Sequence, residues 1–389
     1  MIFRRRLFLV STLFFSFFLS SCGYVRALAD QVPGQAQAQD ADRLVEIARA
    51  YSTTGLPGAA TPVPETPTAA AAAAPIDDGS EYEYESQMMM YLVRKDYDSL
   101  EREARDARSR KVRFKGGTWK LYDFYEGISK PPLGDQATDE DWNLQIEALK
   151  AWTAARPDSA AARIALAETY VNFAFRARGS GYADTVSADG WNLSGQRVSM
   201  AASTLVEASK LGEKCPYWFE VMQEVALTQG WDKSQAKALL DAAMAFEPTF
   251  YHYYREYANF LLPKWNGDPG DAPAFAEQIS NQLGGQQGKF VYFEVSSTIV
   301  CGCNSDGDDS QLQLLSWPKI KDGYAALGQL YGYSNLKLNR FAYMAVLEHD
   351  RPAARSAFAV IGDSWENKVW NSQLDFLNAK VWAESQQGQ

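Results

Sequence analysis

Apolar residues along most of this chain recur three or four positions apart, the spacing of a helix with one buried face. Beyond residue 81 this spacing dominates, and the alternation of apolar and polar residues that is typical of strands is nearly absent. Asp96 and Asp98 interrupt one apolar stripe and predict a break between two helices. Arg156-Pro157 ends another, because proline lacks the amide hydrogen that a helix needs. The two stripes are Met89, Leu92, Val93, Leu100, Ala104 and Trp142, Ile146, Leu149, Trp152.

Two segments need a separate decision. Residues 290–300 are ambiguous, since Val291, Phe293, Val295 and Ile299 fit a period of two as well as a helix. The neighbouring segments are helical, so we expect a helix there. Between residues 41 and 51, Leu44, Ile47, Ala48 and Tyr51 fall at helical spacing and predict a short helix that docks on the folded body.

An internal repeat indicates how the helices are arranged. Small residues at one-turn spacing allow two helices to approach closely, and a larger residue between them fills the gap against the next pair. We therefore predict an all-α fold, an irregular tetratricopeptide-like helical-repeat solenoid, with a non-repeating helical domain as the alternative. The matching positions are Ala201, Leu205, Ala208; then Ala236, Leu240, Ala243 with Pro248; then Ala342, Ala345, Ala354, Phe358 around a turn at His349, Asp350, Arg351.

The first residues of the chain form an export signal. Arg4, Arg5 and Arg6 precede an apolar run from Leu7 to Leu19. A membrane-spanning helix needs roughly 20 apolar residues, so this run is too short for one. Leu19-Ser20-Ser21-Cys22 resembles the lipobox of bacterial lipoproteins. That resemblance implies cleavage before Cys22, a diacylglyceryl group on its thiol and an acyl chain such as palmitate on the new amino terminus. An ordinary cleaved signal peptide is the alternative.

The predicted lipid anchor also implies a location in the cell envelope. In Gram-negative lipoproteins, which the chain resembles, Gly23 rather than Asp after the lipidated cysteine implies transfer to the outer membrane, facing the periplasm. We divide the chain into a signal peptide (1–21), a lipid-anchored Ala/Pro-rich linker (22–80) and a helical domain (81–389). The linker has too few apolar residues to offset its ordering entropy. Residues 55–80, if extended at ~3.1 Å each, would reach on the order of 80 Å from the membrane.

The net charge limits the class of partner that the chain can bind, and the cysteine content limits the disulfides that it can form. Removal of residues 1–21 leaves 35 basic against 48 acidic side chains, a mature charge of about −13. This balance argues against nucleic acid, which selects basic surfaces. Once Cys22 carries lipid, Cys215, Cys301 and Cys303 remain. Either Cys215 pairs with one of the other two or all three are thiols, and the sequence leaves both alternatives open.

Motifs for catalysis or metal binding are missing from the sequence. His252 and His349 are the two histidines of the chain, and neither accompanies a nucleophile or a second ligand. Residues 284–288 are glycine-rich but lack the Lys-Ser/Thr of a phosphate cradle, so we expect a loop. Residues 304–309 alternate like a calcium loop but lack its glycine and glutamate, and two cysteines, Cys301 and Cys303, are a weak zinc site. We predict no catalytic residue, metal or cofactor.

Two segments resemble a named family. The segment YHYYREYANFLLPKWNG (251–267) and the later LNRFA (338–342) are similar to the bacterial domain-of-unknown-function family numbered 4034. The resemblance covers roughly residues 88–370. It implies a tetratricopeptide-like α-helical fold and brings no established activity.

Aromatic residues supply the best binding candidates. Tyr251, Tyr254, Tyr257 and Phe260 mark one side of a helix and are expected in the core. Aromatic residues outside that stripe can anchor a partner, because Tyr and Trp carry much of the energy of interfaces. The nominated binding residues are Tyr253, Arg255 and Trp265.

The function expected from the sequence is therefore binding of a protein or peptide partner by a membrane-anchored helical-repeat lipoprotein without enzymatic activity. An envelope hydrolase or a glycan-binding accessory protein is the alternative. Two carboxylates ~5–10 Å apart in a cleft would favour the enzyme. A concave groove without converging titratable groups would favour the binding protein.

Overall fold

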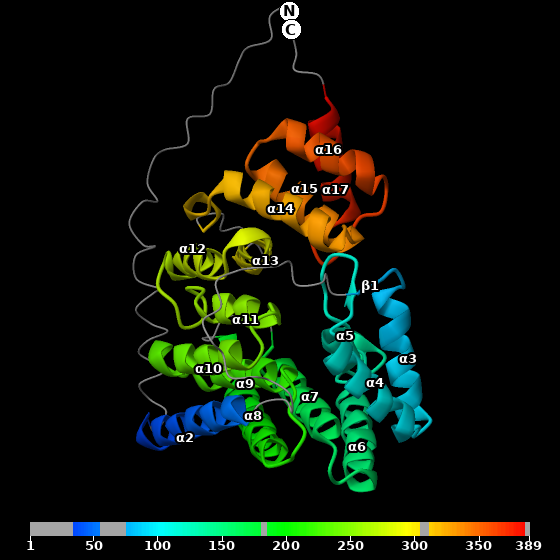
Figure 1. The fold of residues 1–389 in the computed structure, drawn as a ribbon, viewed down its shortest axis with the longest axis vertical. Helices are drawn as coiled ribbons and strands as arrows, with labels where there is room; N and C mark the ends of the chain where they lie inside the picture. The colour runs from blue at the N-terminus through cyan, green and yellow to red at the C-terminus, as the bar shows by residue number, and fades with distance from the viewer. Residues whose placement is uncertain (1–33, 55–74, 180–184, 304–310, 386–389) are drawn as a thin grey trace, which may run out of the picture.

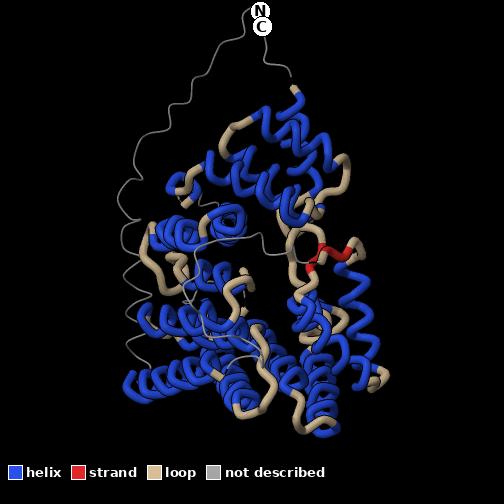
Figure 2. Tube along the Cα trace, in the orientation of Figure 1, coloured by secondary structure: helices blue, strands red, loops and turns tan. Residues whose placement is uncertain are grey.

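The computed structural model describes residues 34–54, 75–179, 185–303 and 311–385, and these are almost entirely helical (Figures 1 and 2). Two strands of two residues each pair in parallel, with Ile76 opposite Arg113. The elements are α2 (Gly34–Thr53), β1 (Ile76–Asp77), α3 (Glu81–Val93), α4 (Tyr97–Arg110), β2 (Arg113–Phe114), α5 (Lys120–Glu126), η1 (Gly134–Gln136), α6 (Asp139–Ala155), α7 (Ala160–Arg178), α8 (Ala188–Ser209), α9 (Tyr217–Gln229), α10 (Lys233–Phe246), α11 (His252–Phe260), α12 (Asp271–Leu283), α13 (Gly285–Cys303), η4 (Leu312–Leu314), α14 (Trp317–Tyr331), α15 (Asn335–Leu347), α16 (Arg351–Ile361) and α17 (Gln373–Glu384).

Helices that follow one another in the chain pack side by side. The most extensive contacts join α7 to α8, α13 to α14, α12 to α13 and α15 to α16. Figure 1 shows these pairs stacked from α6–α8 at one end of the molecule, through α9–α13, to α14–α17 at the other, with α3–α5 alongside. The predicted all-α helical-repeat fold is confirmed.

The repeat positions lie where the packing argument places them. Ala208 and Ala243 are at most 1% exposed, and so are Ala342, Ala345, Ala354 and Phe358. A capping box between Asp232 and Gln235 begins α10, satisfying free amide groups at the helix start. The turn between α15 and α16 contains His349 with a φ of 54°. The predicted turn therefore uses the left-handed backbone region.

We expect overpacking to reveal this register. Replacing Ala243 by leucine adds atoms to a fully buried contact and should lower the free energy of unfolding by ~1–3 kcal/mol, and Ala208→Leu should behave alike. Ala245, two residues further along the same helix, is exposed. Its replacement by leucine is the control and should change the stability by less than about 0.5 kcal/mol. Thermal or urea unfolding measures all three. Equal stabilities for Ala243→Leu and Ala245→Leu would contradict the register.

Helix α2 corrects the predicted linker. Ala41, Leu44, Ala48 and Tyr51 are buried against the body, as expected of a short docked helix. The Tyr51 ring stacks on Trp218 with 4.5 Å between ring centroids, and its hydroxyl accepts a hydrogen bond of 2.7 Å from the backbone amide of Cys215. Residues 34–53 therefore belong to the folded body rather than to a linker spanning 22–80.

The position of α2 also changes the reach of the tether that the sequence predicts. Residues 55–74, which lie outside the described residues, join α2 to β1 within one body, so they do not separate that body from a membrane. Eleven residues, 23–33, lie between Cys22 and α2. Even fully extended at ~3.6 Å per residue they would span about 40 Å, half the reach expected from the sequence.

Other sequence expectations have mixed outcomes. The ambiguous segment is helical, as predicted, and forms part of α13. The glycine-rich run is not a loop: Gly284 alone links α12 to α13, and residues 285–288 form the first turn of α13, because the positive φ of 63° at Gly284 ends one helix directly before the next. Cys215 is a buried free thiol, so the disulfide alternative is wrong for it. The side chains of Cys301 and Cys303, and residues 304–310, lie outside the described residues.

A candidate site built from buried carboxyl groups

Helices α5, α7, α9 and α11 lie near one another in the molecule (Figure 1). Each carries a glutamate whose charge acts on glutamates of the other helices. Glu220 and Glu224 are four residues apart and thus share one face of α9, a helix whose remaining surface is largely buried and apolar. Glu168 is equally unusual, being 1% exposed in the alanine-rich α7. Charged residues are rarely buried unless they have partners or a function. We call the following residues the glutamate cluster: Glu126 of α5, Glu168 of α7, Glu220 and Glu224 of α9, and Glu256 of α11.

Glu168 and Glu224 form the centre of the glutamate cluster. Glu224 lies near enough to Glu168 to lower the pKa of Glu168, and the Glu168 charge acts on Glu224 in turn. Burial, and then the Glu168 charge, raises the pKa of Glu224 well above its usual range. Glu168 Oε1 accepts a hydrogen bond from Asn172 Nδ2 at 3.2 Å.

The remaining glutamates crowd this pair. Burial raises the pKa of Glu220 well above its usual range, and the nearby Glu256 charge adds to the effect. Burial likewise raises the pKa of Glu256, opposed by Arg255. At the outer edge, Lys130 Nζ donates to Glu126 Oε2 at 2.7 Å, and these side chains are 41% and 23% exposed. The attraction of Glu126 raises the pKa of Lys130, so that ammonium stays charged.

The cluster should give this protein an unusual pH dependence of stability. Burial raises the pKa of Glu168 from 4.5 to about 7. The folded state then holds a proton that the unfolded chain releases above 4.5, so stability is greatest below that pH and is lost as the pH rises through 7. The difference between the two pKa values corresponds to roughly 3 kcal/mol.

We expect the free energy of unfolding to rise by roughly 2 kcal/mol when the pH falls from 8 to 5.5. Glu168→Gln removes one of the titrating groups and should reduce this slope, while Glu220, Glu224 and Glu256, whose pKa values are also raised, keep the remainder. Glu140→Gln, at an exposed position of α6, is the matched control and should keep the parent slope. Urea titrations at several pH values measure the slopes. Identical slopes for the two variants would contradict the assignment.

A second group of charges lies beside the cluster. The Glu294 carboxylate of α13 accepts from the Lys337 ammonium of α15, and both side chains are at most 2% exposed. Burial lowers the pKa of Lys337 to about 8, an effect that Glu294 opposes. Arg255 Nε donates to Thr298 Oγ1 at 3.0 Å, and its charge acts on both Glu256 and Lys337. Arg255 thus lies between the glutamate cluster and this cationic side.

His252 is held in an aromatic stack. Its imidazole lies between Tyr122 and Tyr251, with ring centroids 4.0 and 4.3 Å away. Burial, together with the charge of Arg255, lowers its pKa well below 6.5, so the ring is neutral. It is 1% exposed, and neither ring nitrogen has a hydrogen-bond partner among the described residues. This packing is that of a structural histidine, and the sequence around His252 contains no nucleophile or second ligand.

The three predicted binding residues, Tyr253, Arg255 and Trp265, differ in how deeply they are buried. Tyr253 is fully buried, and its hydroxyl donates to the Pro216 carbonyl at 3.2 Å, so a surface role for Tyr253 is wrong in this conformation. The Tyr253 ring packs against Phe250 and Phe219, because the residues at this end of α11 are all buried. Trp265 is half-buried, with the Arg178 guanidinium 4.7 Å from its ring centroid. Binding by Arg255 or Trp265 stays a prediction.

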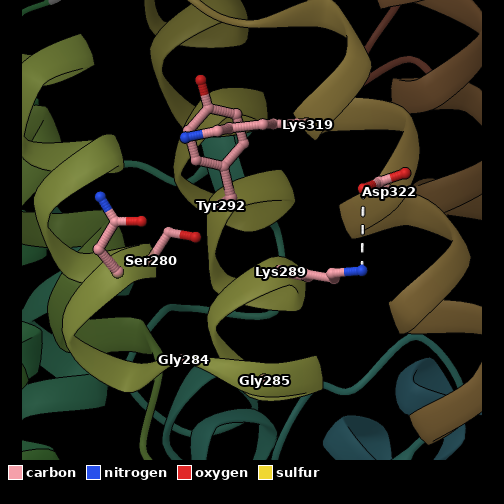
Figure 3. A pocket seen from close by; sticks show the side chains of 8 residues that line it. Ser280, Gly284, Gly285, Lys289, Tyr292, Lys319 and Asp322 are labelled. Carbon is pink, nitrogen blue, oxygen red and sulfur yellow. Dashed lines mark ion pairs between the residues drawn. The ribbon is translucent and has the colours of Figure 1, made fainter.

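A separate pocket of about 290 Å³ opens between α12, α13 and α14 (Figure 3). Lys289 faces Asp322 across it at 3.8 Å. Lys319, which lies beside the Tyr292 ring, pairs with Glu277. These charges are exposed and already compensated by acids. The pocket therefore carries a weaker argument for a ligand than the glutamate cluster does.

Comparison with known proteins adds no relative: no protein-family model, curated protein or solved structure matches the chain. The family resemblance of residues 88–370 stays a prediction. Within the described residues, no helix is both long enough and apolar enough to cross a membrane. The described part of the chain also contains no group of three His, Cys, Asp or Glu side chains placed to hold a metal ion.

One feature of the sequence could have predicted the cluster, and our sequence analysis missed it. Glu168, Glu220 and Glu224 interrupt helices that are otherwise apolar or alanine-rich, and carboxylates in such helices are costly to bury. The partners of these glutamates come from segments far apart in the chain, so their convergence could not be read from spacing.

Proposed function

We propose that this protein is a lipid-anchored helical-repeat lipoprotein of the bacterial cell envelope that binds a protein or peptide partner at the glutamate cluster. The anchor is Cys22, and the outer membrane, on its periplasmic side, is the proposed location. The observation that carries the binding proposal is the convergence of five carboxyl groups from four helices on one region. Helical-repeat proteins bind partners on extended concave surfaces, and Glu126 is the member of the cluster that we expect a partner to reach first.

The position of the cluster supports this role. Glu168 and Glu220 are almost fully buried and Glu224 and Glu256 are partly buried, whereas Glu126 and Lys130 keep solvent contact. A partner side chain would therefore meet Glu126 first and the Glu168–Glu224 pair deeper inside. Uncompensated carboxyl groups are a cost to stability, and a ligand that supplies positive charge would offset it.

The alternative, an envelope hydrolase or glycan-binding protein, rests on the neighbouring carboxyl groups of Glu168 and Glu224. General acid–base catalysis uses such paired carboxyl groups. A glycoside hydrolase places its two carboxyl groups on either side of the bond that it cleaves, whereas an oxygen of each of these two glutamates is buried. The hydrolase would be supported if the protein released soluble fragments from purified cell-wall glycan and Glu168→Gln abolished that release.

Cys22→Ser should move the protein from the membrane to the soluble fraction, because an acyl anchor needs the thiol. The melting temperature should be unchanged, since Ala41 is the first buried apolar residue in the described part of the chain. Ser21→Ala, which keeps a small residue before the cleavage point, is the control and should stay with the membrane. Fractionation of cells followed by immunoblotting measures both variants. Cys22→Ser recovered in the membrane pellet would contradict the lipobox interpretation.

The binding proposal is tested by cross-linking in intact cells. Glu126→Lys reverses the charge at the solvent-accessible edge of the cluster and should abolish a cross-link that the parent protein forms. Glu140→Lys makes the same change at an exposed site of α6 and should keep the cross-link. A parent protein without any cross-linked partner, or equal cross-linking by both variants, would overturn the proposal.

A further inference from the structure

The unsatisfied atoms of the glutamate cluster are mostly acceptors. Glu168 Oε2, Glu220 Oε2 and Glu224 Oε2 are buried and receive no N–H or O–H from the described residues under ordinary donor geometry. Glu168 and Glu220 are only 1% and 3% exposed, so both carboxyl groups are shielded from solvent. Since carboxylate oxygens only accept, a matching ligand must donate.

The Ser129 hydroxyl is a further buried polar group beside the glutamate cluster. Ser129 is fully buried, and its hydroxyl has no partner in the described part of the chain. Asn172 Nδ2 is 3.4 Å from the Ser129 carbonyl and 3.2 Å from Glu168 Oε1, so Ser129 borders the cluster. A buried hydroxyl without a partner costs roughly 1–3 kcal/mol. A polar ligand beside Glu168 would supply the missing hydrogen bond.

The charge balance specifies the sign of the ligand. Five carboxyl groups face two cations, and one of these, Arg255, also interacts with Glu294 and Thr298. The other, Lys130, already shows that the cluster holds an ammonium, 2.7 Å from Glu126. The titratable groups that face the cluster are Glu85 of α3, Tyr122, Asp123 and Glu126 of α5, Lys130 after it, Glu168 of α7, Tyr217, Glu220 and Glu224 of α9, and Arg255 and Glu256 of α11.

An organic cation fits these acceptors better than a metal ion. Divalent metals need several ligands converging within ~2–2.6 Å of one point, and the described residues contain no such group. The acceptors are instead distributed over α7, α9 and the segment after α5. The ring of Tyr122, partly accessible beside them, can also contact a cation through its face.

We propose that the glutamate cluster is a binding site for an organic ammonium or guanidinium group, which enters past Glu126 and Lys130 and is held by Glu220, Glu224 and Ser129. This deepens the proposed function and rests on it where the cation is a Lys or Arg side chain of the partner. A free polyamine carries the same chemistry. Because protons occupy the carboxyl groups at low pH, the cation must displace them, and binding should release protons.

Calorimetric titration of the full mature chain in detergent tests the site, with two probes, spermidine and an end-blocked pentalysine peptide. We expect at least one probe to bind at pH 8, with proton release and at least tenfold weaker affinity at pH 5.5. Glu220→Gln and Glu224→Gln should each weaken binding at least tenfold. Glu277→Gln, beside the pocket of Figure 3, is the matched control and should leave affinity unchanged. Tighter binding of pentalysine identifies a partner segment as the source of the cation, and tighter binding of spermidine identifies a polyamine.

The inference is overturned if neither probe binds, if both glutamine variants keep the parent affinity, or if calcium alone binds with the same loss in the variants. Melting temperatures show whether each variant is folded; if one is not, the pH dependence of the parent decides. Failure of this inference differs from failure of the proposed function. If Glu126→Lys loses the cross-link but neither probe binds, the proposed partner is kept and the cation site is rejected. If spermidine binds but the parent protein forms no cross-link, the cation site is kept and the proposed partner is rejected.

Discussion

Replacing Glu294 by leucine is expected to lower the free energy of unfolding by about 3–5 kcal/mol, because it leaves the buried Lys337 ammonium without its carboxylate. The cost should decrease as the pH rises toward 9. The pKa of Lys337 is about 8 with Glu294 present and would fall further without it, so the side chain can lose its proton in that range. Urea unfolding at pH 7 and pH 9 measures both effects.

Two further variants separate this effect from loss of packing. Glu294→Leu combined with Lys337→Met removes both charges and should recover most of the stability, because apolar pairs of similar volume replace buried ion pairs well. Lys289→Met breaks the exposed pair with Asp322 and should cost less than about 1 kcal/mol. A double variant as unstable as Glu294→Leu would show that shape rather than charge governs this position.

Truncating Tyr253 to alanine is expected to cost about 3–5 kcal/mol, because its ring is fully buried against Phe219 and Phe250. Tyr253→Phe keeps the ring and loses the hydrogen bond to the Pro216 carbonyl, so its cost should be about 1 kcal/mol. Thermal unfolding measures both.

Tyr82→Ala is the exposed control, since Tyr82 is 75% exposed, and should stay within about 0.5 kcal/mol of the parent. Cross-linking by Tyr253→Ala should fall only in proportion to the folded fraction. If Tyr253→Ala keeps the parent melting temperature but forms no cross-link, Tyr253 binds the partner and its assignment to the core is wrong.

Local patterns were sufficient to predict the helices of this protein. Spacing of apolar residues, proline and small side chains act within one or two turns, so they identified α3, α4, α6 and the repeat positions of α8, α10, α15 and α16. The same reasoning predicted the docked helix within α2 from Leu44, Ala48 and Tyr51. It misplaced the linker boundary, because a composition rich in alanine and glutamine does not show where a helix will find an apolar face to pack on.

For the candidate site, the sequence determined that acids outnumber bases and that a few glutamates lie in apolar helices. Only the tertiary structure brought Glu126, Glu168, Glu224 and Glu256 together, since each comes from a different helix and their convergence depends on how those helices pack. It also placed Tyr253 in the core, although the residue lies off the predicted aromatic stripe. Periodicity gives the direction of a side chain from its own helix. What lies in that direction is decided by helices distant in the chain, and burial, charge coupling and pKa follow from those neighbours.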